Sequence, residues 1–352
     1  MQQKESFLTA LKNEISSDDN FINRKEIIET IYFGGGTPSL LSNDEIRDIL
    51  FALQKEFIIS SDVEITLEAN PDDINNEIVK NWIGSGVNRL SVGIQSFDAE
   101  ELKWMNRAHD AKQAIDCIQI LQDSGLTNFS VDLIFGGPYL SNQSLEKNIR
   151  IISDYKIPHI SCYALTLEEK TALHHLVKSK KSPPISNEKQ AEQFIITMRR
   201  LAEEGYEQYE ISNYAKPDMR SKHNSSYWKG NSYWGFGPSA HSFNGTNTRR
   251  WNISNNSKFI NNWLIHLPVV EVEILTDIQQ LNEYIMTSIR TMDGIDLELI
   301  ENRFGVEKAK KIKSESQKFI LSEKMITTSK HLILTEKGKL FADAITASLF
   351  FE

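Results

Sequence analysis

Cysteine is scarce in this sequence, which has two cysteines in 352 residues. Cys117 and Cys162 lie far apart along the chain, and each is surrounded by apolar residues. This excludes a disulfide framework, because such a framework needs several paired cysteines. It also excludes a metal site built from thiolates alone, because such a site needs three or four ligands at close spacing.

Long apolar runs and an excess of basic residues are also absent. No segment approaches the ~20 apolar residues of a membrane-spanning helix, and the opening MQQKESFLTA lacks the apolar block of a secretory signal. Lysine and arginine number 39 against 48 acidic residues, so the formal net charge is −9. An acidic chain has no general attraction to nucleic acid or to anionic membranes. We therefore expect a cytoplasmic protein with no transmembrane segment and no nucleic-acid partner.

What the first 165 residues do contain is an alternation of two hydrophobic periodicities. Short β-branched runs are separated by stretches with apolar residues at helical spacing. Ser42 and Glu45 form a capping box that begins one helix, and Gly125 ends another. Strands that alternate with helices predict parallel strands joined by crossover helices, in an α/β sheet or barrel. The predicted strands are 27–33, 63–68, 89–95, 128–135 and 159–164, with a further one at 208–212.

The remainder of the chain has a different character. Residues 213–265 show little periodicity and are rich in Asn, Gly, Ser and aromatic residues. So much aromatic surface in a long irregular segment favours a functional role over disorder. From about residue 277 helices, two short strands and a final helix are predicted, in the order of a small winged-helix module. We therefore divide the chain into a barrel (1–212), an aromatic, glycine-rich region (213–275) and a C-terminal module (276–352).

Glycines and polar side chains gather at the ends of the predicted strands. In a barrel of parallel strands, the carboxyl ends form the rim where ligands bind. A lone carboxylate such as Glu68 or Asp132 is more often solvated or salt-bridged, but recurrence at successive strand ends favours a ligand site. Carboxylates accept from hydroxyl and ammonium groups, and Arg107 suits a ligand carboxylate. The strand-end sequences are GGGTPS at 34–39, EANP at 68–71, QSF at 95–97, GGP at 136–138 and YALT at 163–166.

Together these motifs resemble the radical S-adenosylmethionine enzymes. Within them, the order and spacing of GGGTPS, EANP, SVGIQSF, DLIFGGP and YALTLEEKT follow the branch that holds oxygen-independent coproporphyrinogen III oxidase and its haem-chaperone relative. The resemblance covers nearly the whole chain, the C-terminal module included. It implies a partial (β/α)6 barrel of the radical-SAM type that lacks its first strand, with a winged-helix-like C-terminal module.

The resemblance also implies S-adenosylmethionine as a cofactor and assigns residues to it. The methionine part would meet Gly35, Gly36 and Thr37, and the ribose would meet Glu68. The rest of the pocket would be formed by Gln95, Arg107, Asp132 and Ala164. No catalytic side chain is assigned.

A candidate haem ligand comes from the aromatic region. His223 opens the sequence HNSSYW at 223–228, which is similar to the HNxxYW signature of the haem chaperone, and YWGFGPSAHSF at 233–243 is similar to that form too. Imidazole ligates haem iron, and flat side chains cover the macrocycle. Two interpretations stay open: His223 ligates haem, or it only anchors its loop through hydrogen bonds. His241 is the second candidate ligand and His109 the third.

One motif of the family does not occur in this sequence. Family members open with a strand and Cys-x-x-x-Cys-x-x-Cys, whose thiolates hold a [4Fe–4S] cluster that reduces the cofactor. Here MQQKESFLTALKNEI resembles the segment that follows that motif. Cys117 and Cys162 cannot replace it, since one lies on the apolar face of a predicted helix and the other within a predicted strand. We expect the chain as written to bind no such cluster, as a truncated, mis-started or degenerate family member.

The sequence thus predicts a haem-chaperone-like protein that binds haem and S-adenosylmethionine and delivers haem to acceptor proteins. The alternatives are oxygen-independent coproporphyrinogen III oxidase, an enzyme of porphyrin biosynthesis, and a cluster-free carrier of haem or porphyrin. Whether the chain is an enzyme stays open. With the first strand of the family missing, the strand at 27–33 becomes a sheet edge, and this predicts pairing with another chain, including a homodimer.

Overall fold

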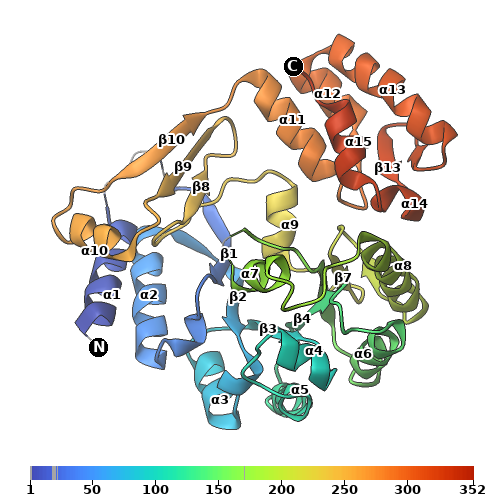
Figure 1. The fold of residues 1–352 in the computed structure, drawn as a ribbon. Coiled ribbons are helices and arrows are strands. Elements are labelled where there is room, and N and C mark those ends of the chain that lie inside the picture. The colour runs from blue at the N-terminus through green and yellow to red at the C-terminus, as the bar shows by residue number, and fades with distance from the viewer. Residues whose placement is uncertain (1, 18–20, 22, 170) are drawn as a thin grey trace.

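The computed structural model describes residues 2–17, 21, 23–169 and 171–352. Its central element is a seven-stranded sheet in the order β1-β2-β3-β4-β5-β7-β6. The first five strands are parallel and curl into an open half-barrel with helices on its outer face (Figure 1). They are β1 (Ile27–Phe33), β2 (Ile58–Ala69), β3 (Arg89–Gln95), β4 (Phe129–Phe135) and β5 (His159–Ala164). The predicted partial α/β barrel is confirmed.

Helices connect these strands, and their ends follow local sequence signals. The predicted capping box is present, because Ser42 Oγ accepts from the Glu45 amide at 3.3 Å and Glu45 Oε2 accepts from the Ser42 amide at 2.7 Å. The helices are α2 (Asn43–Glu56), α3 (Asn76–Gly84), α4 (Ala99–Trp104), α5 (Ala111–Asp123), α6 (Asn142–Asp154), α7 (Ala172–Lys178) and α8 (Asn187–Glu203). Short 3-10 turns, Pro38–Leu40 and Pro71–Asp73, follow β1 and β2.

Side chains alternate along the parallel strands between an apolar outer face and a polar inner face. On β3, Leu90, Val92 and Ile94 are buried in the largest hydrophobic core. Their neighbours Arg89 and Ser91 point to the opposite face, because successive side chains of a strand face opposite ways. The helices therefore cover the apolar face, and the inside of the half-barrel is left to polar groups that can form a site.

The further strand predicted at 208–212 is not formed as one strand. The chain makes a tight hairpin of β6 (Glu207–Gln208) and β7 (Asn213–Ala215), and β7 pairs antiparallel with β5. The Asn213 side-chain amide donates to the Glu210 carboxylate across the turn. This local hydrogen bond closes the hairpin, so the intervening residues cannot continue as an extended parallel strand.

The region from 213 to 265, which was expected to be irregular, contains regular structure. It includes α9 (Lys222–Trp228), β8 (His241–Phe243), β9 (Thr248–Asn252) and α10 (Asn256–Leu264), and β8 and β9 form an antiparallel sheet with β10 (Val270–Ile274). Strands of three and five residues are too short to show a clear period in sequence. Phe259 and Trp263 of α10 are buried with Phe7 of α1 (Gln2–Ile15) packed against them. This sheet therefore lies beside β1 and α1 (Figure 1).

The C-terminal module has a hydrophobic core of its own, which includes Leu281, Ile285 and Ile300. It consists of α11 (Asp277–Ser288), β11 (Ile295–Asp296), α12 (Leu297–Phe304), α13 (Val306–Leu321), β12 (Met325–Thr327), β13 (His331–Leu334), α14 (Glu336–Lys339) and α15 (Ala342–Leu349). Its three strands form a sheet in the order β11-β13-β12. The predicted order of elements is observed, with two differences: the two-residue strand β11 was not predicted, and the single final helix is divided into α14 and α15.

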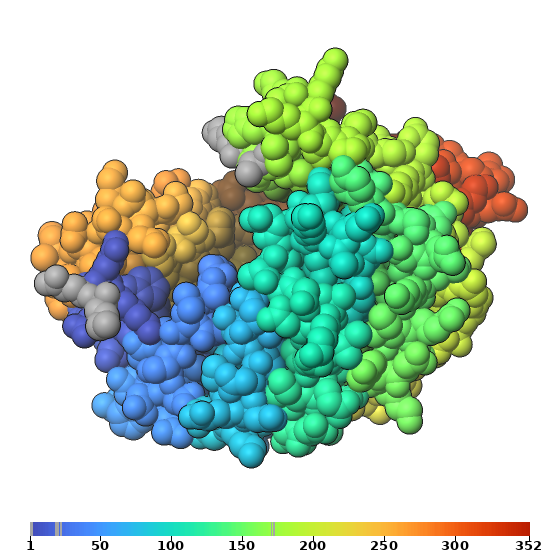
Figure 2. Space-filling view, turned by 60° about the horizontal axis from the view of Figure 1, so that its bottom comes forward, coloured from blue at the N-terminus to red at the C-terminus, as the bar shows by residue number. Residues whose placement is uncertain are grey.

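The edge of the main sheet lies at β1. Within the described ranges β1 pairs with β2 and with no second strand, and Ile27 is 63% exposed. Figure 2 shows a recess in the surface between the blue N-terminal segment, the orange segment and the green part of the molecule. In the part of the chain that the structure describes, no helix combines the length and apolar character needed to cross a membrane.

Candidate functional site

The carboxyl ends of β1 to β5 lie next to one another along one rim of the half-barrel, because the strands are parallel and adjacent in the sheet. His223 reaches the same part of the molecule from α9, which packs on β1. Residue 170, within the motif at 163–171, lies outside the described residues. Six of the predicted residues lie in this rim region at or just after strand ends, and a seventh lies in the loop between α4 and α5. Asp132 alone lies within a strand, β4. The rim residues are Gly35, Gly36, Thr37, Glu68, Gln95 and Ala164, and the loop residue is Arg107.

The loop after β1 brings a backbone amide to Glu68. Gly35 N donates to Glu68 Oε2 at 3.1 Å, and the Tyr32 hydroxyl donates to Oε1 at 2.8 Å. Gly35 and Gly36 have φ values of 73° and 72°, a region that favours glycine. A Cβ atom on Gly34 would lie 2.6 Å from the Tyr32 ring. Glycine is therefore required at position 34 because the chain passes close to the Tyr32 ring, and it is favoured at 35 and 36 because of their backbone conformation.

A second group of polar side chains lies at the end of β3. Gln95 has a φ of 68° where the pairing of β3 with β4 shifts register, and its Nε2 lies 2.9 Å from an ideal Cβ position on Gly93. Arg107 Nη2 donates to Asn70 Oδ1 at 2.8 Å and to Gly93 O at 2.9 Å. Arg107 Nε is buried and has no hydrogen-bond partner in the described part of the chain. A guanidinium with an unused donor suits a ligand carboxylate.

Asp132 lies on the inner face of β4. Ser91 Oγ donates to Asp132 Oδ1 at 3.4 Å. The pKa of Asp132 is raised to about 6, mainly by burial and also by the Glu68 charge, while hydrogen bonding from Ser161 and the Arg89 charge oppose the rise. The Glu68 and Asp132 carboxylates are therefore close enough to repel each other. Ala164 ends β5 on the same rim and is exposed there.

His223 is held in one orientation by residues of β1 and α9. Its Nδ1 is 2.8 Å from Thr30 Oγ1, its ring stacks on Tyr32 with centroids 4.7 Å apart, and the Tyr227 ring meets it edge-on at 5.0 Å. Nε2 has no hydrogen bond to any described residue. Burial lowers the pKa of His223 to about 4, so the imidazole is neutral at pH 7. A neutral imidazole with one nitrogen held and the other free is in the state that ligates metals.

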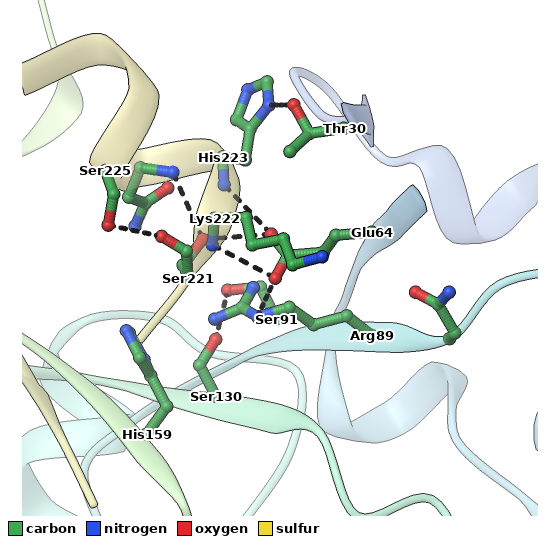
Figure 3. A network of polar contacts seen from close by, with 12 residues as sticks. Thr30, Glu64, Arg89, Ser91, Ser130, His159, Ser221, Lys222, His223 and Ser225 are labelled. Carbon is green, nitrogen blue, oxygen red and sulfur yellow. Dashed lines mark hydrogen bonds and ion pairs between the residues drawn. The ribbon is translucent and has the colours of Figure 1, made fainter. Parts of the chain in front are cut away.

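The backbone of α9 is anchored by a buried carboxylate from β2. Glu64 accepts from the amides of Lys222 and His223 at 3.1 and 3.0 Å, and from Ser221 Oγ at 3.3 Å. Buried Arg89 lies beside it, with Nε 4.0 Å from Glu64 Oε2. Figure 3 shows Glu64 reaching the start of α9 from the barrel interior. Because a carboxylate there binds free amides and complements the helix dipole, Glu64 fixes the direction in which α9 presents His223.

His223 and the glycine loop line one cavity of about 1190 Å³. Of the nine predicted residues, four line it: Gly35, Thr37, Glu68 and His223. Trp234 and Phe236 give it an aromatic wall, and β1 runs along it. The structure therefore brings the β1 and β2 ends together with His223, whereas Gln95, Arg107, Asp132 and Ala164 lie farther along the rim.

The two other candidate histidines are placed differently. His241 lines the same cavity and is exposed, with its ring stacked on Trp251 at 5.6 Å. His109 is 3% exposed, its Nε2 lies 3.0 Å from Ile94 O, and it does not line the cavity. The geometry therefore keeps His241 as a second candidate ligand and sets His109 apart.

The described residues do not fit the iron–sulfur cluster of the family. Cys117 and Cys162 are 1% and 3% exposed. Burial raises the pKa of the Cys117 thiol to about 12, and it raises that of Cys162 as well. Thiols that stay protonated in a core are not metal ligands. Within the described ranges, no group of three or more His, Cys, Asp or Glu side chains is arranged to hold a metal ion. No chemical step is therefore assigned to a cluster.

Sequence reasoning missed four residues that shape this site. All four lie at positions of β1 to β3 whose side chains face the barrel interior, and they are Thr30, Tyr32, Glu64 and Arg89. A usable signal was present, since polar residues occur at every second position of strands that are otherwise apolar. The sequence prediction considered only the residues at the strand ends, and these four lie within the strands.

Comparison of the sequence with known proteins shows which family this chain belongs to. A family model described as the Radical SAM superfamily matches residues 19–152, and one described as the HemN C-terminal domain matches residues 275–341. The protein named heme chaperone HemW from Lactococcus lactis subsp. lactis is 30% identical over 317 residues, which cover 89% of this chain and 82% of the relative. The protein of the same name from Bacillus subtilis is 30% identical over 100% of this chain and 93% of its own length.

A solved structure shares the fold. Coproporphyrinogen III oxidase (HemN) from Escherichia coli superposes with a TM-score of 0.83 over 99% of this chain and 84% of that chain, at 20% identity. An identity of 20% shows a shared fold only, whereas the relatives at 30% identity show the family. The chain therefore belongs to the radical SAM proteins with a HemN C-terminal domain, together with relatives named heme chaperone HemW that match it at 30% identity over most of its length.

Proposed function

We propose that this chain binds haem through His223 and passes it to acceptor proteins. The observation that carries the proposal is the state of His223, which is neutral, held by Thr30 at Nδ1, and free at Nε2 in a large cavity. Imidazole in this state ligates haem iron. The cavity's aromatic wall, with Trp234 and Phe236, offers flat surfaces to a macrocycle. The name of the relatives, heme chaperone, supports the same assignment.

S-adenosylmethionine is proposed to bind along the strand ends. Glu68 accepts from the ribose hydroxyls, and the unused Nε donor of Arg107 faces the amino-acid carboxylate. Gly35, Gly36 and Thr37 contact the methionine part, and Gln95, Asp132 and Ala164 complete the pocket. Family membership supports this cofactor. Because the described residues do not fit a cluster, we assign S-adenosylmethionine a binding role only.

Titration of the full chain with hemin tests the haem proposal. We expect a sharpened, shifted Soret band that saturates near one hemin per chain, because axial ligation by imidazole changes the haem spectrum. His223→Ala should remove this band while the far-UV circular dichroism stays close to that of the parent. His175→Ala is the matched control, since His175 is exposed on α7 and does not line the cavity.

Two outcomes would contradict the proposal. If His223→Ala and His241→Ala both bind hemin as the parent does, His223 is only an anchor for α9. If the parent shows no saturable band, the chain does not bind haem in this form. Incubation with coproporphyrinogen III and S-adenosylmethionine tests the oxidase alternative, and we expect no decarboxylated product.

A further inference from the structure

A second, smaller cavity lies where three parts of the molecule meet. It has a volume of about 230 Å³ and lies between α9, the β8–β9 hairpin, and helices α11 and α12 of the C-terminal module. Five residues line both this cavity and the larger one that contains His223: Tyr227, Gly230, Asn231, Tyr233 and Gly245. The two spaces therefore adjoin. At this size the smaller one cannot enclose a whole cofactor, since cavities that do so measure roughly 300–1,000 Å³.

The smaller cavity is cationic in an acidic protein. Lys229, Arg249 and Arg303 line it against one carboxylate, Glu283, which leaves a net charge of 3 − 1 = +2. Arg303 Nη2 donates to the neutral Gln280 amide oxygen at 2.9 Å. Among the described residues no acidic oxygen lies within the 4.0 Å of an ion pair with Arg303. Arg303 is exposed, so its charge is solvated and is not held in an ion pair with a described residue.

Arg249 also has a hydrogen-bond donor without an acceptor among the described residues. Its Nη2 pairs with Glu283 Oε2 at 2.7 Å, but its Nε is buried and has no hydrogen-bond partner in the described ranges. A buried N–H without an acceptor costs free energy, which a ligand oxygen would recover. Arginine donors in a fork are suited to carboxylates.

A row of rings leads from His223 to this cationic cavity. The His223 and Tyr227 ring centroids are 5.0 Å apart, those of Tyr227 and Tyr233 4.7 Å, and those of Tyr233 and Phe243 6.3 Å. The Arg249 guanidinium carbon lies 5.6 Å from the Phe243 ring. Tyr227 and Tyr233 line both spaces, so a ligand bound at His223 can reach the cationic groups past these two rings.

We propose that the smaller cavity is a carboxylate subsite, in which Arg249 and Arg303 hold the propionate groups of a tetrapyrrole whose ring lies in the larger cavity. This inference rests on the proposed function, because it takes the ligand of His223 to be haem. Two propionates match the net charge of the cavity. Because Arg249 and Arg303 come from the β8–β9 hairpin and from the C-terminal module, the ligand joins these two parts of the chain.

Hemin and hemin dimethyl ester distinguish propionate recognition from binding of the ring. The full chain is titrated with each, and the Soret band reports ligation by His223. We expect Arg303→Gln and Arg249→Gln each to weaken hemin binding about ten- to a hundredfold, the effect of losing a charged hydrogen bond. The same variants should bind the dimethyl ester as the parent does, and the position of the Soret band should not change. Glu283→Gln should bind hemin more tightly, because it removes a competing carboxylate.

Controls separate the subsite from general effects. Arg47→Gln, on the exposed surface of α2 and outside both cavities, should leave both affinities unchanged. Arg249→Lys keeps the charge and loses the fork, and it replaces Arg249→Gln if circular dichroism shows that the latter does not fold. If the parent ligates hemin and the ester equally well and the arginine variants have no effect, the subsite is disproved and the haem proposal stands. If the parent ligates neither, both proposals fall.

Discussion

At the scale of single residues, Tyr32 joins the two halves of the candidate site. Its hydroxyl donates to Glu68 on the rim, and its ring stacks on His223. Burial raises the pKa of Tyr32 above its ordinary value, and the neighbouring Glu68 charge raises it further, so the phenol stays protonated and remains a donor. A ligand that binds Glu68 therefore also affects Tyr32, whose ring is in direct contact with His223.

The first prediction concerns the cost of keeping Asp132 charged inside the barrel. Its pKa is raised to about 6 in the folded state, whereas an unfolded aspartate titrates near 3.9. The folded state therefore holds the proton more tightly, and stability falls as the pH rises through this window. Asp132→Asn should match the parent below about pH 4 and be more stable at pH 7, by at most about 3 kcal/mol. Urea denaturation across this pH range measures the difference, and a variant less stable than the parent at pH 7 would contradict the prediction.

The second prediction uses the lowered pKa of His223. With a folded-state pKa of about 4, the imidazole stays neutral well below the ordinary titration range of histidine, near pH 6.5. The hemin Soret band should therefore keep its amplitude from pH 8 to about pH 5 and fall only near pH 4. Half-loss near pH 6.5 would show instead that an ordinary solvent-exposed histidine is the ligand. Because the unfolded state gains the proton first, this residue also makes the fold less stable as the pH falls from 6.5 to 4.

At the scale of secondary-structure elements, α9 owes its position to the barrel more than to its own sequence. It has seven residues, which is too short to be stable alone. Its own cap, Ser221, accepts from the Asn224 amide at 3.2 Å, and Glu64 of β2 binds the preceding free amides. The helix that carries His223 is thus held by a side chain that lies 159 positions earlier in the sequence, on the strand next to β1.

A third prediction follows for Glu64. Glu64→Ala should lower the free energy of unfolding by about 3–5 kcal/mol, because it removes the carboxylate paired with buried Arg89 and leaves that charge without an ion pair. It should also weaken hemin binding, although Glu64 does not line the haem cavity. Glu64→Gln should lie between the parent and Glu64→Ala, since it keeps one oxygen acceptor for the amides of α9.

The matched control is Asp62→Asn. Asp62 pairs with the Lys222 side chain of the same helix at 2.8 Å, but both groups are exposed, and exposed ion pairs contribute little. Urea denaturation should therefore give nearly the parent value for this control. If Glu64→Ala is as stable as Asp62→Asn, then Glu64 does not hold α9 in place.

At the scale of the whole molecule, the open edge of the main sheet is the feature with the largest consequence. In the described ranges β1 pairs on one side only, and a cavity runs along it. A free edge with apolar side chains is a template for pairing with another strand. Ile27 is 63% exposed there, and Ile58, its partner on β2, is 52% exposed.

The fourth prediction is that the chain associates through this edge. Its mass, measured by light scattering, should rise with concentration toward a dimer or larger species. Ile27→Lys should reduce this association, because a charged side chain on an edge strand opposes pairing. Lys55→Ala, on the outer surface of α2, serves as a control and should associate as the parent does. A parent chain that stays a monomer at all concentrations would refute the prediction.

Much of the fold could be predicted from the sequence, because its determinants are local. The strands at 27–33, 89–95 and 159–164 have the predicted limits, and the capping box of α2 is formed as predicted. The prediction failed where elements are very short, as in β6, β7 and the β8–β9 hairpin. Elements of two to five residues have no measurable period, so pairing with distant residues decides their structure.

What the sequence by itself determined is which residues end the strands and which motifs tie the chain to its family. What only the tertiary structure decided is which of those residues meet. Thr30 and His223 are 193 positions apart and Glu64 and His223 are 159 positions apart, yet their contacts fix the orientation of the candidate haem ligand. The physical reason is that these contacts lie on the inner face of a curled sheet, where the order of the strands, and not distance along the chain, sets which side chains become neighbours.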